Sequence, residues 1–385
     1  MKETDSQKLS IQQLLSVMER RDASDAYLTA DMPPSYRIDG IVHTMNQPAL
    51  TAVQCEQLAY SIMNDKQQST FAAEHEMNLA LSFHDIGRFR VNIFRQRGHI
   101  GMVIRKVKLE IPTIDELGLP DIFRDIVMEP RGLVLMVGAT GCGKSSSLAA
   151  MVDWRNSNQS GHIISIEDPI EFIHQHKKSV ITQREIGTDT LEYQTALKNA
   201  LRQAPDVILI GEIRDRETME HALEFSETGH LCLATLHANN ANQALERIIN
   251  FFPEDLHPQV CLNLALNMKA VLSQRLVRSL DGKRLPAVEI LLNTPRISDL
   301  IIKWSISEIK ESMATGKNYG MQTFDQSLLA LWKEGLISEN EALRHADSVN
   351  NIRLQIKMVN LKDSGGQAGD LEQASRNISS HGLDI

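Results

Sequence analysis

The stretch from residue 138 to residue 146 carries residue types that hold phosphate groups. It reads Gly-Ala-Thr-Gly-Cys-Gly-Lys-Ser-Ser and fits the pattern G-x-x-x-x-G-K-[ST]. The glycines let the backbone approach phosphates, Lys144 supplies a positive charge, and the Ser145 hydroxyl can ligate Mg²⁺. An apolar run precedes the stretch and a helical pattern follows it, so the sequence predicts a site for Mg-ATP. The residues expected to form it are Gly138, Ala139, Thr140, Gly141, Cys142, Gly143, Lys144, Ser145 and Ser146.

An acidic side chain is expected to hold the metal ion through water. Glu212 follows the apolar run Val207–Ile210 and one glycine, as expected of a buried strand that delivers an acid to the C-terminal edge of a sheet. Most strands of this kind end in Asp, so the longer Glu side chain would have to extend to the water molecules that surround the metal ion. The alternative is a strand end with a solvated Glu.

A second acidic cluster follows the apolar run at residues 163–166. Glu167, Asp168 and Glu171 stand within five positions. Crowded carboxylates face water or a cation, because burying like charges together is costly. ATP hydrolysis needs a side chain that polarises the attacking water, and one of these could provide it. A solvated strand end is the alternative here too.

A histidine and several arginines complete the candidate residues. His237 follows the apolar run at residues 231–234, where it could hydrogen-bond the γ-phosphate, although a lone His also serves as a capping or core residue. Arg88 and Arg90 share one face of a predicted strand, and Arg105 is on the next strand. These arginines could reach a neighbouring subunit's ATP, or form a solvated basic edge that discourages strand addition.

The bulk composition describes a globular protein of two or three domains. The 385 residues are 42% hydrophobic and 23% charged. The start has no secretory pattern, and no run reaches the ~18 apolar residues of a spanning helix, so we expect membrane contact only through protein partners. A net charge of −9 argues against general electrostatic binding of nucleic acid. The four cysteines have neither zinc nor disulfide spacing and suit a reducing cytoplasm.

Residues 1–110 have the pattern of a small α+β domain. Asp39-Gly40 between two short β-like runs predicts a hairpin, and apolar spacing predicts a helix between Thr51 and Met63. Further strands are expected at residues 79–83, 88–94 and 101–105. Pro112 interrupts regular structure, so we expect a linker over residues 111–118.

Beyond the linker, short apolar runs alternate with helical patterns, which indicates a parallel sheet covered by helices. The runs are residues 133–137, 163–166, 207–210 and 231–234. We expect this ATPase domain to span residues 119–360, with a mostly helical part from Asn263 to about Val359. Residues 361–385 are polar and glycine-rich, which predicts a flexible tail.

Together the motifs resemble the secretion ATPase superfamily and, within it, the PilT/PilU family of type IV pilus retraction ATPases. The resemblance runs from about Ala23 to Lys357. It is carried by residues 167–172 (EDPIEF), similar to the family's Asp box; 211–215 (GEIRD), similar to its atypical Walker B; 228–230 (TGH) and 235–237 (TLH), similar to its His box region; and 183–185 (QRE) and 321–325 (MQTFD).

The resemblance implies an α/β chain with a small PAS-like α+β N-terminal domain. A RecA-like P-loop ATPase domain with a helical C-terminal part follows it. It also implies a cytoplasmic homohexamer, peripheral at the inner-membrane pilus base, that uses ATP and Mg²⁺. No nucleic-acid partner is expected.

Roles for single residues also follow from the resemblance. By it, Glu171 is the candidate general base, Glu212 the ligand of Mg²⁺ through water, and His237 the γ-phosphate contact, beside the catalytic Lys144. Arg90 and Arg105 become the arginines most expected to act on a neighbour's nucleotide, ahead of Arg88 and Arg95.

One segment departs from the PilT pattern. Residues 296–303 read RISDLIIK where PilT-type chains carry AIRNLIRE. With the extended tail, this resembles the accessory branch of the family, which implies a PilT-type retraction ATPase and an inner-membrane pilus platform protein as partners. An autonomous PilT-type motor is the alternative.

Three more distant alternatives remain. A pilus-assembly or type II secretion ATPase would carry a C-x-x-C…C-x-x-C insertion and a longer N-terminal region, and this chain has neither. A hexameric nucleic-acid translocase would be expected to carry interleaved aromatic and basic residues, which this sequence lacks. A nucleotide-dependent scaffold would not need the catalytic set.

Overall fold

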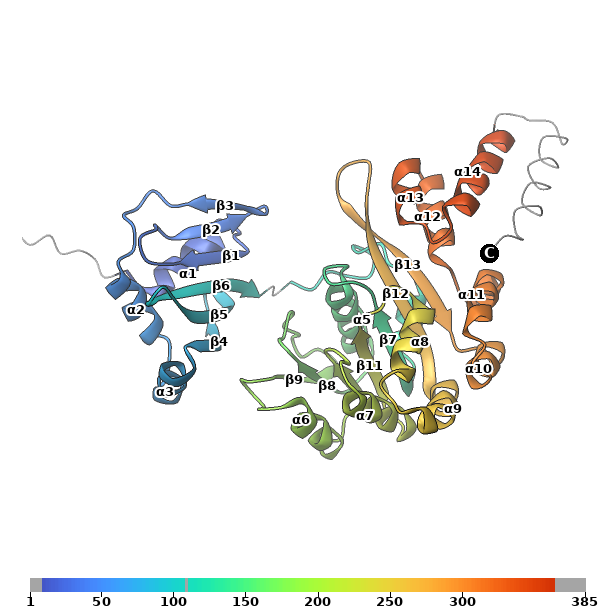
Figure 1. Ribbon diagram of the computed structural model, residues 1–385, viewed down its shortest axis with the longest axis horizontal. Helices are drawn as coiled ribbons and strands as arrows, with labels where there is room; N and C mark the ends of the chain where they lie inside the picture. The colour runs from blue at the N-terminus through green and yellow to red at the C-terminus, as the bar shows by residue number, and fades with distance from the viewer. Residues whose placement is uncertain (1–8, 108–109, 364–385) are drawn as a thin grey trace, which may run out of the picture. The chain divides into compact units, whose positions relative to one another are not determined.

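The computed structural model describes residues 9–107 and 110–363 (Figure 1). The chain divides into two compact units. The first comprises Met1–Ile111, Ile170–His174 and Glu185–Leu191, and the second Pro112–Pro169, Gln175–Arg184 and Glu192–Ile385.

The first unit is built on a six-stranded sheet in the order β3-β2-β1-β6-β5-β4. Its strands are β1 Asp25–Leu28, β2 Ser35–Ile38, β3 Ile41–Thr44, β4 Glu76–Phe83, β5 Gly87–Gln96 and β6 His99–Val107. Its helices are α1 Ile11–Arg20, α2 Ala52–Tyr60 and α3 Asp65–Glu74. Each helix begins at a capping box, formed by Ser10, Thr51 or Asn64 with a glutamine three residues later.

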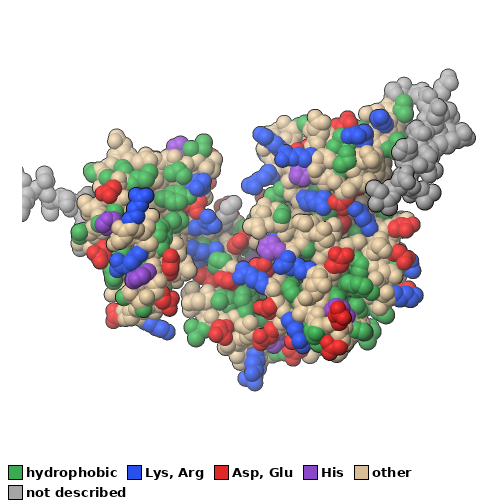
Figure 2. Space-filling view, in the orientation of Figure 1, with side chains coloured by type: hydrophobic (Ala, Val, Ile, Leu, Met, Phe, Trp, Pro, Cys, Tyr) green, Lys and Arg blue, Asp and Glu red, His purple; other side chains and the backbone are tan. Residues whose placement is uncertain are grey.

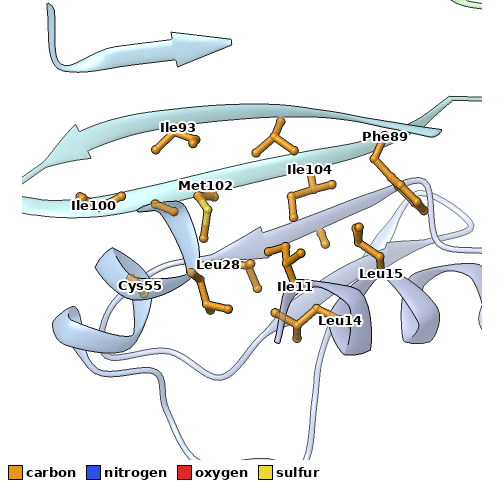
Figure 3. Packing of buried hydrophobic residues seen from close by; sticks show 14 of the residues in the cluster. Ile11, Leu14, Leu15, Leu28, Cys55, Phe89, Ile93, Ile100, Met102 and Ile104 are labelled. Carbon is orange, nitrogen blue, oxygen red and sulfur yellow. The ribbon is translucent and has the colours of Figure 1, made fainter. Parts of the chain in front are cut away.

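The expected hairpin between β2 and β3 is present. Asp39 and Gly40 both have positive φ angles, of 50° and 81°, as a two-residue hairpin turn requires. Apolar side chains from α1, α2, β1, β5 and β6 fill the core of this unit (Figure 3). Leu15, Ile93 and Ile104 are among its fully buried members.

The second unit is built on a seven-stranded sheet in the order β13-β12-β7-β11-β10-β8-β9. Its strands are β7 Gly132–Val137, β8 Gly161–Glu167, β9 Ser179–Glu185, β10 Val207–Ile210, β11 Leu231–Leu236, β12 Met268–Arg278 and β13 Arg284–Leu292. From β8 through β10, β11 and β7 to β12 all neighbours pair in parallel. Every residue of β7, β10 and β11 is buried, as the continuous apolar runs predict.

Helices cover both faces of this sheet and extend the unit beyond β13 (Figure 1). They are α4 Ile122–Val127, α5 Lys144–Asn158, α6 Tyr193–Ala200, α7 Arg216–Glu227, α8 Ala241–Ile249, α9 His257–Asn267, α10 Pro295–Ile302, α11 Ile306–Thr315, α12 Phe324–Lys333, α13 Glu339–His345 and α14 Val349–Asp363. Apolar residues of α4 and α5 share a core with alternate residues of β7, β10 and β11. The mixed α/β fold expected from the sequence, with its helical C-terminal part, is confirmed.

One feature of the C-terminal part was not predicted. Within the mostly helical segment from Asn263 to Val359, β12 and β13 form a long antiparallel hairpin. β12 also pairs in parallel with β7 and is largely buried, so its alternating apolar residues face two helical layers. Residues 279–283 connect the two strands, and Gly282 in this connection has a φ of 85°.

Helix α14 runs to Asp363, so the first three residues of the expected tail are helical. The remaining tail residues, 364–385, lie outside the described residues. Among the helices that the structure describes, none combines the length and the apolar character needed to cross a membrane. On the face turned to the viewer in Figure 2, acidic and basic side chains of the second unit are intermixed.

Candidate functional site

The phosphate loop lies between β7 and α5, as the sequence predicts. Gly138, Gly141 and Gly143 all have positive φ angles, of 153°, 77° and 91°. A Cβ at Gly138 would stand 2.4 Å from the Cys142 sulfur and 2.6 Å from the Gln274 carbonyl oxygen, so only glycine fits there. The loop therefore has the close backbone packing that lets N–H groups surround a phosphate.

Lys144 is the first residue of α5 and is buried. Its Nζ donates hydrogen bonds to the carbonyl oxygens of Gly138, at 2.8 Å, and Ala139, at 3.0 Å. These two hydrogen bonds hold the ammonium group against the first residues of the phosphate loop. The N-cap residue of this 15-residue helix is Gly143, which makes no side-chain capping bond, and the positive end of the helix dipole favours an anion there.

Two further members of the loop have simple local roles. Burial raises the pKa of the Cys142 thiol, which therefore stays protonated and fills space. Ser145 stands in the first turn of α5. Its hydroxyl and the carboxylate of Glu212 are oxygen donors, the kind of ligand that Mg²⁺ prefers, so the residues present fit that ion.

Gln274 of β12 holds the phosphate loop from behind, and sequence reasoning did not identify it. Its Nε2 donates to the Cys142 carbonyl oxygen at 2.8 Å, and its Oε1 accepts from the Ser147 hydroxyl at 2.8 Å. A Cβ on Gly143 would stand 2.7 Å from the same Nε2. Gln274 is separated from the loop by about 130 residues, so only the parallel pairing of β12 with β7 reveals the contact.

Parallel register brings the other candidates of the second unit to the same edge of the sheet. Ile210 pairs with Ile166 and with Ala234, and Leu236 pairs with Val137, directly before the phosphate loop. The segments that follow β8, β10 and β11 therefore lie side by side at the carboxyl ends of the strands.

Glu212 and His237 are in direct contact at this edge. Glu212 Oε1 lies 3.2 Å from His237 Nε2, and Glu212 Oε2 accepts from Arg214 Nε at 2.7 Å. Arg214 also reaches Asp168 at 3.4 Å. His237 lines a cavity of about 410 Å³ together with Gly138, at the start of the phosphate loop. The structure thus brings together three of the predicted residues, Lys144, Glu212 and His237, within one unit.

The second acidic cluster is divided between the two units. Glu167 Oε1 accepts from Ser165 Oγ at 2.6 Å and from Gln183 Nε2 at 3.3 Å. Glu171 is exposed and belongs to the segment Ile170–His174 of the first unit. Its role as general base stays a prediction.

Arg90 and Arg105 are direct cross-strand partners on β5 and β6. Arg105 Nε donates to Asp25 Oδ1 at 2.8 Å, and this hydrogen bond raises the pKa of the arginine. Arg90 Nη2 donates to the Ile170 carbonyl oxygen. Asp25 is buried and was not identified from the sequence, because nothing in its local pattern distinguishes it from other strand residues.

Comparison with known proteins agrees with this architecture. The family model described as Type II/IV secretion system protein matches residues 3–323. The chain is 53% identical to the type IV pilus ATPase PilU of Pseudomonas aeruginosa, over 92% of this chain and 94% of that protein. It is 41% identical to the type IV pilus retraction ATPase PilT of the same organism, over 89% of this chain and 100% of that protein.

Solved structures give the same result. A crystal structure of the pilus retraction motor PilT with bound ADP has a TM-score of 0.83 and 38% identity, over 88% of this chain and 98% of that chain. The phosphate loop and the Glu212–His237 pair thus occur in a chain whose fold resembles that of an ADP-bound relative over 88% of its length. The chain therefore belongs to the type II/IV secretion system protein family and, within it, to the PilT/PilU ATPases.

Proposed function

We propose that this ATPase is a hexameric, Mg²⁺-dependent motor that assists type IV pilus retraction alongside a PilT-type ATPase. It works in the cytoplasm, at the pilus base on the inner membrane, where it acts on a platform protein. Likeness to PilU over 92% of the chain carries this proposal.

The residues of the second unit divide the work of hydrolysis between them. Lys144 neutralises charge on the β- and γ-phosphates, and the N–H groups of the loop and of α5 bind their oxygens. Ser145, and Glu212 through water, would hold Mg²⁺, which when bound neutralises the charge that develops on the phosphates. His237, fixed by Glu212 at 3.2 Å, is oriented toward the cavity that adjoins Gly138 and contacts the γ-phosphate.

The first unit supplies the remaining groups. Glu171 accepts a proton from the attacking water. Arg90 and Arg105 act on the nucleotide of a neighbouring subunit, where their guanidinium groups stabilise the transition state. Asp25 supports this role, because it binds Arg105 through Nε and so restrains the side chain before the nucleotide is met. Loss of the γ-phosphate changes these contacts and rotates the two units, a ligand-driven hinge change.

Helix α10 supports the accessory role. Its Ser298 hydroxyl donates to the Ala265 carbonyl oxygen and to Asn293 Oδ1, each at 2.9 Å. Lys303 pairs with Asp299 at 2.9 Å. Matched residue by residue with AIRNLIRE, the PilT-type chains carry Arg at the positions of Ser298 and Ile302, and Glu at that of Lys303. A serine bonded to its own unit and an exposed isoleucine cannot replace two bidentate guanidinium donors.

Retraction in living cells tests the proposal. A strain that lacks its PilT-type ATPase should not retract labelled pili when it expresses this chain at high level. A strain with a weakened PilT-type ATPase should retract faster with this chain than with its Lys144→Ala variant. Robust retraction without any PilT-type partner would overturn the accessory role and make the chain an autonomous motor.

A further inference from the structure

The loop that carries His237 is anchored on both sides by arginines. This loop, residues 237–240, connects β11 to α8 and lines the cavity next to the phosphate loop. Arg247 of α8 donates to the His237 carbonyl oxygen at 2.9 Å. Arg275 of β12 donates to the Asn239 carbonyl oxygen at 3.4 Å. The backbone on either side of the loop's centre is therefore held by a guanidinium group.

Arg275 differs from Arg247 in what else it binds. Its Nη1 donates to the His345 carbonyl oxygen at the end of α13, at 2.7 Å, and its Nη2 lies 2.7 Å from Asp347 Oδ1. The guanidinium carbon also stands 3.8 Å from the ring centre of Phe324 on α12. A single side chain thus contacts the His237 loop, α12 and the end of α13.

The helical side of this contact is itself firmly bound. Asp347 pairs with Lys310 of α11 at 2.8 Å. Buried Asp325 of α12 accepts from the backbone N–H groups of Asp347, at 2.8 Å, and Ser348, at 3.1 Å. The segment between α13 and α14 is therefore bonded to both α11 and α12, so Arg275 contacts a set of helices that are joined to one another.

β12 places Arg275 next to a residue that binds the phosphate loop. Gln274 points to Cys142 and Ser147, whereas Arg275 points to the opposite side of the strand, as alternate residues do. Any change in the position of the His237 loop must therefore change the distance between Asn239 and a guanidinium that the helices hold in place. An arginine is needed, because its planar fork serves several acceptors at once.

We propose that Arg275 is a positioning residue for ATP hydrolysis, which sets the His237 loop against the helices α11–α13. The inference rests on the proposed contact of His237 with the γ-phosphate. Because Arg275 acts through the loop, its loss should misplace His237 without removing a group that binds ATP. The effect should fall on kcat rather than on KM.

A double-mutant cycle in the purified full-length protein tests this, with Mg-ATP as substrate. Arg275→Lys keeps the charge and loses the fork, and should lower kcat by roughly 10- to 100-fold with little change in KM. His237→Ala should lower kcat as well. If Arg275 acts through His237, the double variant should be no slower than His237→Ala alone. Arg344→Lys, an exposed arginine of α13, is the matched control and should behave as wild type.

Several outcomes would overturn the inference. One is a kcat for Arg275→Lys close to that of wild type, and another is a pair of losses that multiply in the double variant. A multiplied loss would mean that Arg275 supports the fold without acting through the loop. Normal turnover by His237→Ala would instead remove the proposed role of His237, and the inference with it. Thermal unfolding of each variant, which should stay cooperative, separates lost positioning from lost folding.

Discussion

Gln274 donates a hydrogen bond of 2.8 Å from its Nε2 to the carbonyl oxygen of Cys142, inside the phosphate loop. The same side chain accepts from Ser147 in the first turns of α5. A buried amide therefore links β12 both to the phosphate loop and to the helix α5 that follows it. This contact makes the geometry of the nucleotide site depend on a strand far away in the sequence.

Gln274→Ala should loosen the phosphate loop. Because Gln274 is buried, its loss leaves a carbonyl and a hydroxyl without their partner, at a cost on the order of 1–3 kcal/mol in the free energy of unfolding. The KM for ATP should rise, since loop N–H groups lose their fixed directions. Gln259→Ala, at an exposed position of α9, is the control. An unchanged KM and an unchanged melting temperature would contradict this role.

Glu171→Gln should bind ATP normally and hydrolyse it slowly, because it loses a base and keeps its size. We expect roughly a 10²- to 10⁴-fold lower single-turnover rate. Glu167→Gln is the comparison, since that carboxylate already accepts from Ser165 and Gln183. Slow hydrolysis by Glu167→Gln with a normal rate for Glu171→Gln would assign the base to the other carboxylate.

Arg105→Ala and Lys144→Ala should each be inactive alone and should regain partial ATPase activity when mixed in one ring. Complementation is expected because Arg105 serves the neighbour's nucleotide while Lys144 serves its own. A ring made only of differently tagged Lys144→Ala subunits is the control for subunit exchange. With exchange verified, absence of complementation would favour a solvated hairpin edge for Arg90 and Arg105.

Asp347→Asn should remove part of the pH dependence of stability. Burial opposes ionisation, yet hydrogen bonds from Lys310 and Arg275 hold the pKa of Asp347 below its ordinary value of 3.8. The ionised aspartate therefore stabilises the fold above that ordinary value, and this contribution is lost as pH falls through the lowered pKa.

Chemical denaturation at several pH values measures this effect. The wild type should exceed Asp347→Asn in unfolding free energy at about pH 7, and this difference should shrink as the pH falls below 3.8, the ordinary pKa of an aspartate. Asp255→Asn, on an exposed turn, should show no such gap. If the difference in unfolding free energy between the two proteins stays constant down to the lowest pH, the charge of the Asp347 carboxylate does not contribute to stability.

Sequence reasoning found the parts of the site that a local pattern encodes. The phosphate loop has a fixed spacing, and Glu212 and His237 each follow an apolar run, so parallel register brings them together as expected. Asp25 and Gln274 were missed, because each acts on a residue that lies far away in the chain. Their roles depend on strand pairing, which no local pattern states.

The hairpin of β12 and β13 was missed for a different reason. Both strands are largely buried, and their long apolar stretches are shared by buried helices and buried strands alike. Gly282 in the five-residue connection 279–283 favours the second possibility, because a short glycine-containing connection between two apolar runs is typical of a hairpin. Arg275, which lies on β12, could not be placed without that assignment.

ATP hydrolysis by the purified protein, compared with its Lys144→Ala variant, tests the central claim most directly. Lys144 supplies the only phosphate-facing charge that the loop motif requires, so the variant should lose turnover while its melting curve and its elution volume stay those of the wild type. Lys317→Ala, at an exposed lysine, should hydrolyse ATP normally. Near-normal turnover by a folded Lys144→Ala protein would contradict the assignment of the site.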